Sequence, residues 1–292
     1  MNQLGPLAGR DVHLWIARLE ASESNFARAF SWLSPDEVER ADRFRFDKHR
    51  REFVLGRAVL RALIAGYLRM QPHDAAFIYG PKGKPALALA DCSLFFNVSN
   101  SGDLAAYAFT LDCEIGVDVE HRRRLLEIEG IAQRFFAADE VAELMRLPEY
   151  QRPEGFFNCW TRKEAYIKAI GDGLSVPLHS FQVTLQPGDP ARMIELDGSA
   201  AAAERWTLHA FVPAPEYAGA IAYQDRVRPL TVHPLATVDQ LLTNLLLGRS
   251  QVSQNCRQLG VVVISNDRRV PPGAAIAEFH RARLGLSLYR RR

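Results

Sequence analysis

The chain carries the segment WTRKEAYIKAIGDGL at residues 160–174, which reads as a helix followed by its own stop signal. With GFFNC before it, the segment is long enough for a helix of several turns, and Gly171 or Gly173 is typical of a helix C-terminus. Glu164 and Lys168 are four residues apart, so a helix places them on one face. The segment therefore predicts a helix that presents a carboxylate and an ammonium group side by side.

This Glu–Lys pair allows an ordinary interpretation and a functional one. Exposed pairs at this spacing are common and stabilise a helix by only about 0.2–0.5 kcal/mol. However, the pair flanks the apolar stripe Phe156, Trp160 and Ile167 rather than lying opposite it, which favours the edge of a cleft. Lysine usage points to the same region. Only five of the 36 basic residues are lysines, and four of these fall in PKGKP (81–85) and TRKEAYIK (161–168), which marks candidate anion contacts.

The second informative segment is GVDVE at residues 116–120. Alternate residues of a strand share a face, so Asp118 and Glu120 point the same way, about 7 Å apart, while Val117 and Val119 point into apolar packing. Two carboxylates at this spacing, with Glu164 as a third, can hold a divalent cation such as Mg²⁺. A strand with its polar residues in water would give the same pattern.

Further elements are predicted along the chain. Strand-like alternation occurs at 12–19, and a capping box at 34–37 predicts the start of a helix. A longer helix is predicted at 49–68 and another beginning near Ala138, with strands between 94 and 120 and between 180 and 224. A turn with Gly80 and Gly83 separates two strand-like pieces. Residues 235–247 predict an apolar helix, and GVVVIS at 260–265 a strand.

Composition excludes several classes of protein. The 292 residues are 48% hydrophobic and 24% charged, which excludes a disordered or fibrous chain. A formal net charge of +2 does not favour nucleic acid as a partner. No apolar run reaches the roughly 18 residues of a membrane helix, and no secretory signal is visible at the start. Four scattered cysteines without a CxxC pair favour a reducing, cytoplasmic location and no structural zinc.

Four motifs, taken in order, resemble those of the Sfp-type 4′-phosphopantetheinyl transferases. FNVSNS (96–101), part of a polar turn that offers hydroxyl and amide groups to phosphate, is similar to the family's FN(I/V)SHS. GVDVE (116–120) is similar to G(I/V)D(I/V)E, and RFFAADE (134–140) to RFFxxxE. WTRKEAYIKAIGDGLSVPL (160–178) is similar to W(S/T)xKEAxxKxxGxGLxxPL. The resemblance covers roughly Ser34 to Leu178 and includes GKP at 83–85.

The resemblance implies an α+β fold of two pseudo-symmetric halves, each a small antiparallel sheet with a long helix. We expect the halves at residues 1–117 and 118–229, followed by a basic C-terminal extension of unassigned role at 230–292. The implied enzyme transfers 4′-phosphopantetheine from coenzyme A to a serine of an apo acyl or peptidyl carrier protein, with Mg²⁺, and releases 3′,5′-ADP. It would serve fatty-acid, polyketide or nonribosomal-peptide biosynthesis, as a monomer with coenzyme A bound between its halves.

The resemblance also implies roles for individual residues. The metal ligands would be Asp118, Glu120 and Glu164, and Glu164 would also be the candidate base for the carrier serine. The coenzyme A contacts would be Arg51 and Arg57 at the 3′-phosphate, Lys84 and Pro85 at the adenine, Ser99 and Asn100 at a phosphate, and Lys163 and Lys168 at the pyrophosphate. Asp118, Glu164 and Lys168 form the implied catalytic set.

The chain departs from the family pattern at Asn100, where the family has histidine. Asparagine donates only a neutral hydrogen bond, and a charge-assisted bond is roughly twice as strong, so we expect weaker coenzyme A binding with the chemistry retained. Two alternatives remain open on the sequence. One is a Mg²⁺-dependent phosphohydrolase acting on coenzyme A or a nucleotide, and the other is an inactive scaffold that binds coenzyme A or a carrier protein.

Overall fold

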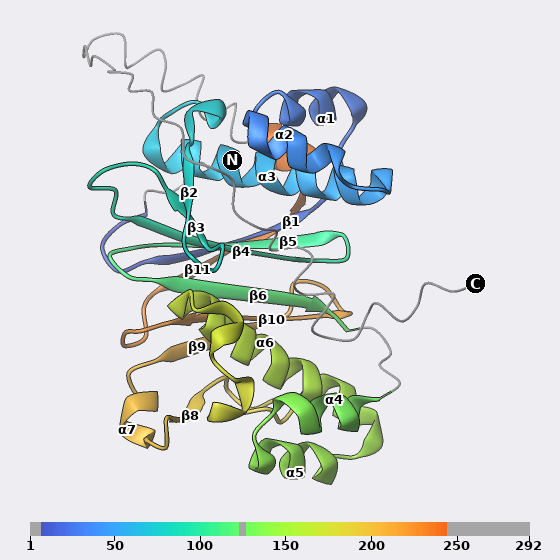
Figure 1. The fold of residues 1–292 in the computed structure, drawn as a ribbon, viewed down its shortest axis with the longest axis vertical. Helices are drawn as coiled ribbons and strands as arrows, with labels where there is room; N and C mark the ends of the chain where they lie inside the picture. The colour runs from blue at the N-terminus through green and yellow to red at the C-terminus, as the bar shows by residue number, and fades with distance from the viewer. Residues whose placement is uncertain (1–6, 123–126, 244–292) are drawn as a thin grey trace. The chain divides into compact units, whose positions relative to one another are not determined.

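A computed structural model describes residues 7–122 and 127–243 and divides them into two compact units. The first unit holds residues 17–76 and 236–243, and the second holds residues 7–16, 77–122 and 127–235. The first unit is largely helical, and the second combines antiparallel sheets with helices (Figure 1). The predicted α+β class is therefore confirmed, whereas the boundary between halves at residue 117 stays a prediction.

The first unit is built on three helices, α1 (Glu23–Phe30), α2 (Pro35–Asp42) and α3 (Asp47–Leu68), with the short 3₁₀ helix η1 (Pro72–Asp74) after them. The predicted capping box is present, since the Ser34 backbone N–H donates to the Glu37 carboxylate at 3.0 Å. That buried carboxylate also accepts from Nε of Arg57 and of Arg61, each at 2.7 Å, which ties α2 to α3.

The start of the predicted C-terminal extension is integrated into the fold. The strand β11 (Leu230–Thr237) runs through the beginning of the predicted apolar helix, and the helix begins only at residue 238. The cause is a second capping box, in which Thr237 and Gln240 exchange backbone-to-side-chain hydrogen bonds of 2.9 and 3.2 Å. Asp239 then accepts from the Ser22 backbone N–H at 3.1 Å, at the start of α1. The predicted strand at 260–265 lies outside the described residues.

The second unit contains a four-stranded sheet, in the order β11-β1-β5-β4, and a three-stranded sheet, in the order β6-β10-β9. Their remaining strands are β1 (Val12–Arg18), β4 (Leu94–Ser101), β5 (Leu104–Leu111), β6 (Ile115–His121), β9 (Thr207–Phe211) and β10 (Tyr217–Tyr223). One apolar cluster joins both sheets, with Leu14 of β1, Ala106 of β5, Val117 and Val119 of β6, and Ile221 of β10. This cluster fixes which face of β6 is left for polar residues.

The long helix α6 (Arg152–Ile170) covers the other face of β6 and β10, with α4 (Ile128–Phe135) and α5 (Ala138–Arg146) packed against it (Figure 1). It ends where predicted, at Gly171 in the left-handed conformation with φ +78°. The smaller elements are β2 (Phe77–Tyr79), β3 (Pro85–Leu87), η2 (Glu149–Gln151), η3 (Gly173–Ser175), η4 (Leu178–Ser180), β7 (Phe181–Val183), β8 (Met193–Leu196) and α7 (Ala200–Ala203). None of the helices among the described residues has the length and apolarity to cross a membrane.

A buried pair of histidines lies at the β1–β11 edge of the four-stranded sheet. The His233 ring stacks on Trp15 at 3.4 Å between centroids and meets the His13 ring edge-on at 5.3 Å. Its Nε2 is buried and has no hydrogen-bond partner within the described part of the chain. Burial, and then the neighbouring His13, lowers the pKa of His233 from 6.5 to about 4.

We expect this histidine to make the protein less stable in mild acid. In the unfolded chain His233 is protonated below about pH 6.5, whereas in the folded chain it is protonated only below about pH 4. Protonation therefore favours the unfolded chain, and the free energy of unfolding decreases as the pH falls from 6.5 to 4. The full effect corresponds to about 3 kcal/mol. Urea unfolding at pH 7 and pH 5 should show a smaller loss in His233→Phe than in the native chain. The control is His73→Gln, a change at an exposed histidine, which should lose as much stability as the native chain. An equal loss in His233→Phe and in the native chain would contradict this expectation.

Candidate active site

The two carboxylates of GVDVE lie on the face of β6 that α6 covers. Asp118 pairs in register with Ala220 and Glu120 with Ala218, and both alanines belong to the apolar core formed with α6. Asp118 is fully buried and Glu120 is 7% exposed. The predicted alternation is confirmed, but the polar face is turned toward a helix rather than toward water.

Gly116 allows α6 to approach this strand closely. A Cβ atom at Gly116 would lie 2.0 Å from the Ala165 carbonyl oxygen and 2.4 Å from the Ala169 backbone nitrogen, both in α6. Any side chain here would push the helix away from the strand. The neighbouring positions on α6, one residue earlier in each case, are Glu164 and Lys168, and the ammonium of Lys168 contacts Asp118.

Three groups meet at the centre of the site. The Lys168 ammonium donates to Asp118 Oδ1 and to Ser99 Oγ, each at 2.7 Å, and Ser99 Oγ donates to Asp118 Oδ1 at 2.9 Å. Ser99 is 4% exposed, whereas the Lys168 side chain keeps 14% of its surface exposed. The result is a buried carboxylate neutralised by an ammonium group that still reaches the surface.

Strand β4 contributes a row of polar side chains that join it to β6 across the seam between the two sheets. Asn97 Oδ1 accepts from the Val117 backbone N–H at 3.0 Å, and Ser101 Oγ donates to the Glu120 carboxylate at 2.7 Å. With Ser99 they occupy alternate positions, so all three face β6. The role of Asn97 and Ser101 in holding β6 is not predicted above, although the alternation of polar residues in an apolar strand indicates that they share one face.

The predicted polar turn is thus mainly strand. β4 continues to Ser101, and the turn is confined to Gly102 and Asp103, because Gly102 takes the left-handed conformation with φ +58°. Asn100 is exposed and alternates with Ser99 and Ser101, so it faces away from Asp118. Ser99 and Asn100, predicted to share one phosphate contact, therefore point to opposite sides of β4.

The third predicted metal ligand, Glu164, is 5% exposed on α6. Within residues 7–122 and 127–243, no group of three or more His, Cys, Asp or Glu side chains is arranged to hold a metal ion. Asp118, Glu120 and Glu164 thus lie on one packed helix–strand pair without forming a ready-made metal centre. The metal ligand set stays a prediction.

Lys163 has partners of its own, away from Asp118. It is fully buried, pairs with Glu140 of α5 at 2.8 Å and donates to the backbone carbonyls of Leu178 and Phe181. Its ammonium also lies 4.3 Å from the centre of the Phe181 ring. The structure therefore does not bring Lys163 together with Lys168, and it gives the glutamate of RFFAADE the role of a buried counter-ion.

The predicted nucleotide contacts are divided between the units. Lys84 and Pro85 belong to the β2–β3 hairpin of the second unit. Arg51 and Arg57 belong to α3 of the first unit, where Arg51 pairs with Glu23 at 3.0 Å and Arg57 with Glu37 at 2.6 Å. The arginines already neutralise carboxylates, and their contact with coenzyme A stays a prediction.

Two family models match the chain. Residues 114–222 match the family model described as "4'-phosphopantetheinyl transferase superfamily", and residues 17–111 match "4'-phosphopantetheinyl transferase, N-terminal". The chain is 38% identical over 218 residues to the 4′-phosphopantetheinyl transferase HetI of Nostoc sp., covering 74% of this chain and 89% of that protein. The chain belongs to the 4′-phosphopantetheinyl transferase superfamily.

Other members of the superfamily are also similar to the chain. It is 33% identical over 179 residues to the 4′-phosphopantetheinyl transferase Sfp of Bacillus subtilis, covering 61% of this chain and 77% of that protein. It is 32% identical over 191 residues to psf-1 of Bacillus pumilus, covering 65% and 76%. The transferase superfamily match at 114–222 contains Asp118, Glu120, Glu164 and Lys168, and Ser99 lies in the N-terminal match at 17–111.

Proposed function

We propose that the cluster of β4, β6 and α6 is the site where this chain transfers 4′-phosphopantetheine from coenzyme A to a serine of an apo carrier protein. Coenzyme A and a carrier protein are the substrates of the family to which the chain belongs. The observation that carries the assignment is the contact of Lys168 with Asp118 and Ser99. A buried acid, a hydroxyl and a partly exposed ammonium group are suited to phosphoryl transfer, which depends on positioning and charge neutralisation.

We propose Mg²⁺ as the metal because the site offers carboxylate ligands. Asp118, Glu120 and Glu164 supply carboxylate oxygens, the ligands that Mg²⁺ prefers in combination with phosphate oxygens and water. The three residues would hold the ion, which when bound supplies positive charge to the pyrophosphate.

The protein groups divide the work between charge and proton transfer. Lys168, with its exposed fraction, is placed to stabilise the negative charge that develops on the leaving 3′,5′-ADP. Glu164 is the candidate base that takes the proton from the carrier serine, because a serine hydroxyl is a poor nucleophile until it is deprotonated. Ser99 orients the ammonium of Lys168 and the carboxylate of Asp118 through its two hydrogen bonds.

The proposal is tested by the intact mass of an apo carrier protein after incubation with the chain, coenzyme A and Mg²⁺, with EDTA as control. A metal-dependent mass gain of one phosphopantetheine is the expected result. Breakdown of coenzyme A without a carrier would instead indicate the phosphohydrolase. Binding of coenzyme A with no turnover on several carriers would indicate the scaffold.

We also propose that the enzyme acts in the cytoplasm as a monomer. The described cysteines, Cys92, Cys113 and Cys159, are all free, which is consistent with a reducing compartment. The residues that meet at Asp118 all come from one chain, so no partner copy is needed to assemble them. Gel filtration combined with light scattering tests the oligomeric state.

Restoring the family histidine at Asn100 should tighten coenzyme A binding. Asn100 is exposed, so Asn100→His is expected to fold normally and to offer a charged donor to a phosphate. We expect the KM for coenzyme A to fall about fivefold, equivalent to about 1 kcal/mol, with kcat little changed. Asn100→Ala, which removes the donor, should raise it. An unchanged or higher KM in Asn100→His would contradict the phosphate contact.

A further inference from the structure

The ammonium of Lys84 connects the ends of the two elements that carry the site. Its Nζ donates to the Ala169 carbonyl oxygen at 2.7 Å and lies 3.4 Å from the Ile115 carbonyl oxygen. It also pairs with the Glu114 carboxylate at 2.5 Å. Ala169 lies in the last turn of α6, directly after Lys168, and Ile115 is the first residue of β6, three residues before Asp118.

This is a favourable place for a positive charge. The last carbonyl groups of a helix have no partner within the helix and carry the negative end of its dipole, so a cation there stabilises the helix end. The Lys84 side chain is only 18% exposed, whereas that of Glu114 is 58% exposed. Burial lowers the pKa of Lys84, and its bonds to Glu114 oppose that effect. The carbonyl groups of Ala169 and Ile115 accept from this ammonium, and leaving a buried carbonyl without a donor would cost free energy.

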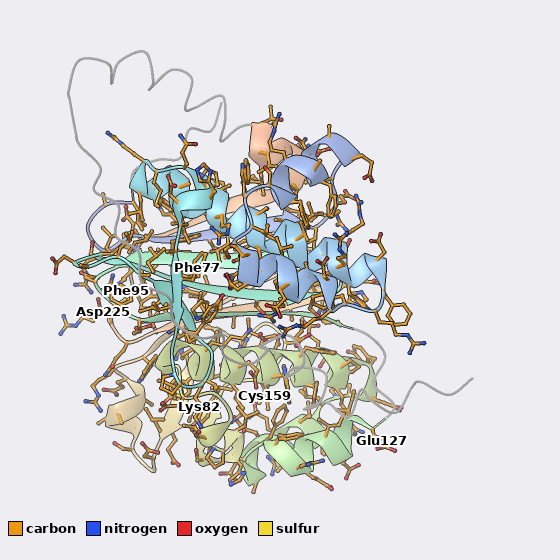
Figure 2. All side chains as sticks on the ribbon, turned by 45° about the horizontal axis from the view of Figure 1, so that its top comes forward. Phe77, Lys82, Phe95, Glu127, Cys159 and Asp225 are labelled. Atoms are coloured by element: carbon orange, nitrogen blue, oxygen red, sulfur yellow. The ribbon has the colours of Figure 1, made fainter. Side chains whose placement is uncertain are left out.

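The turn after α6 is shaped to receive this lysine. A Cβ atom at Gly171, whose φ is +78°, would lie 3.3 Å from Lys84 Cδ, and one at Gly173 would lie 3.4 Å from Lys82 Cβ. The β2–β3 loop is closed by its own hydrogen bonds, from Gly80 N–H to the Lys84 carbonyl at 2.9 Å and from Gly83 N–H to the Gly80 carbonyl at 2.8 Å. Figure 2 shows Lys82 at the tip of this loop. The loop thus lies against the end of α6.

We infer that Lys84 is a positioning residue. It holds the end of α6 against the start of β6 and thereby keeps the ammonium of Lys168 within hydrogen-bond distance of Asp118. The inference rests on the proposed function of that pair. It assigns the Lys84 charge to protein carbonyls, whereas the family resemblance places this residue at the adenine of coenzyme A. It also connects the β2–β3 hairpin mechanically to the helix that carries Glu164 and Lys168.

Two matched variants test this role. Lys84→Met removes the ammonium and keeps a long apolar side chain, while Lys48→Met makes the same change at a lysine of α3 whose side chain is 75% exposed. We expect kcat to fall about tenfold in Lys84→Met, because small displacements of reacting groups are costly, with the KM for coenzyme A within about twofold of the native value. Lys48→Met should behave like the native enzyme. Glu114→Gln should lose less than Lys84→Met, because the Ala169 carbonyl keeps its donor.

Two results would overturn the inference. A raised KM with unchanged kcat in Lys84→Met would make Lys84 a substrate contact, and a lower Tm with both constants unchanged would make its role purely structural. Hydrogen exchange of the α6 end in the substrate-free protein separates this inference from the proposed function, since it needs no turnover. Lys84→Met should speed exchange at Ala169–Gly171, and unchanged exchange there would overturn the inference even if the transfer assay succeeds.

Discussion

Asp118→Asn is expected to lower kcat/KM for phosphopantetheine transfer by about a thousandfold while leaving the protein folded. Asparagine keeps the shape of the side chain and an oxygen for the hydroxyl of Ser99, so the packing of the fully buried position is preserved. It removes the negative charge that Lys168 contacts at 2.7 Å and that would bind a divalent cation. Lys168 is partly exposed, so its ammonium can turn to water rather than remain buried and unpaired.

The matched control for this substitution is Asp112→Asn. Asp112 also pairs with a cation, Arg228, at 2.9 Å, but it is 58% exposed and lies in the turn that follows β5. Initial rates from the intact mass of the carrier protein should be unchanged in Asp112→Asn. Thermal unfolding should show both variants folded at the assay temperature. If Asp118→Asn kept activity within about tenfold of the native enzyme, Asp118 would not belong to the catalytic centre.

The part of this site that sequence predicts is the part set by local geometry. Strand alternation places Asp118 and Glu120 on one face, and the four-residue spacing of Glu164 and Lys168 places them on one flank of α6. Gly171 likewise ends that helix by a local conformational preference. These features depend on a few consecutive residues, so they can be derived before any tertiary contact is known.

What sequence does not predict is which residues meet across the fold. Ser99 reaches Asp118 over 19 residues, and Lys168 reaches Ser99 over 69, so both contacts depend on how β4, β6 and α6 pack. Lys163 is the clearest case. Its place beside Glu164 in one motif suggested one shared site, but consecutive residues of a helix do not face the same way. The available signal is Glu140 in the RFFAADE motif, an acidic residue that needs a counter-ion if it is buried.

Lys163→Met is therefore expected to destabilise the protein by about 3–5 kcal/mol, the usual cost of breaking a buried ion pair on one side. The variant leaves the Glu140 carboxylate, which is 1% exposed, without its counter-ion. That carboxylate also accepts from the backbone N–H groups of Ala137 and Val183, each at 2.8 Å. Any displacement of the Glu140 side chain would therefore disturb the start of α5 and strand β7. Burial already raises the pKa of Glu140, and the loss of Lys163 should raise it further.

Urea unfolding measures this cost, and Lys48→Met is the control. The Lys48 side chain is 75% exposed and its ion pair with Glu52 is long, at 3.8 Å. Its removal should therefore change the free energy of unfolding by less than about 0.5 kcal/mol. The double variant Lys163→Met/Glu140→Gln should be more stable than the sum of the single effects predicts, because neither charge is then left alone. A pyrophosphate contact at Lys163 predicts the opposite pattern, with normal stability and a large loss of transfer activity. A stable but inactive Lys163→Met variant would show that this lysine contacts coenzyme A. An unstable variant whose folded fraction has normal activity would show that Lys163 is a structural residue of the core beside Glu164.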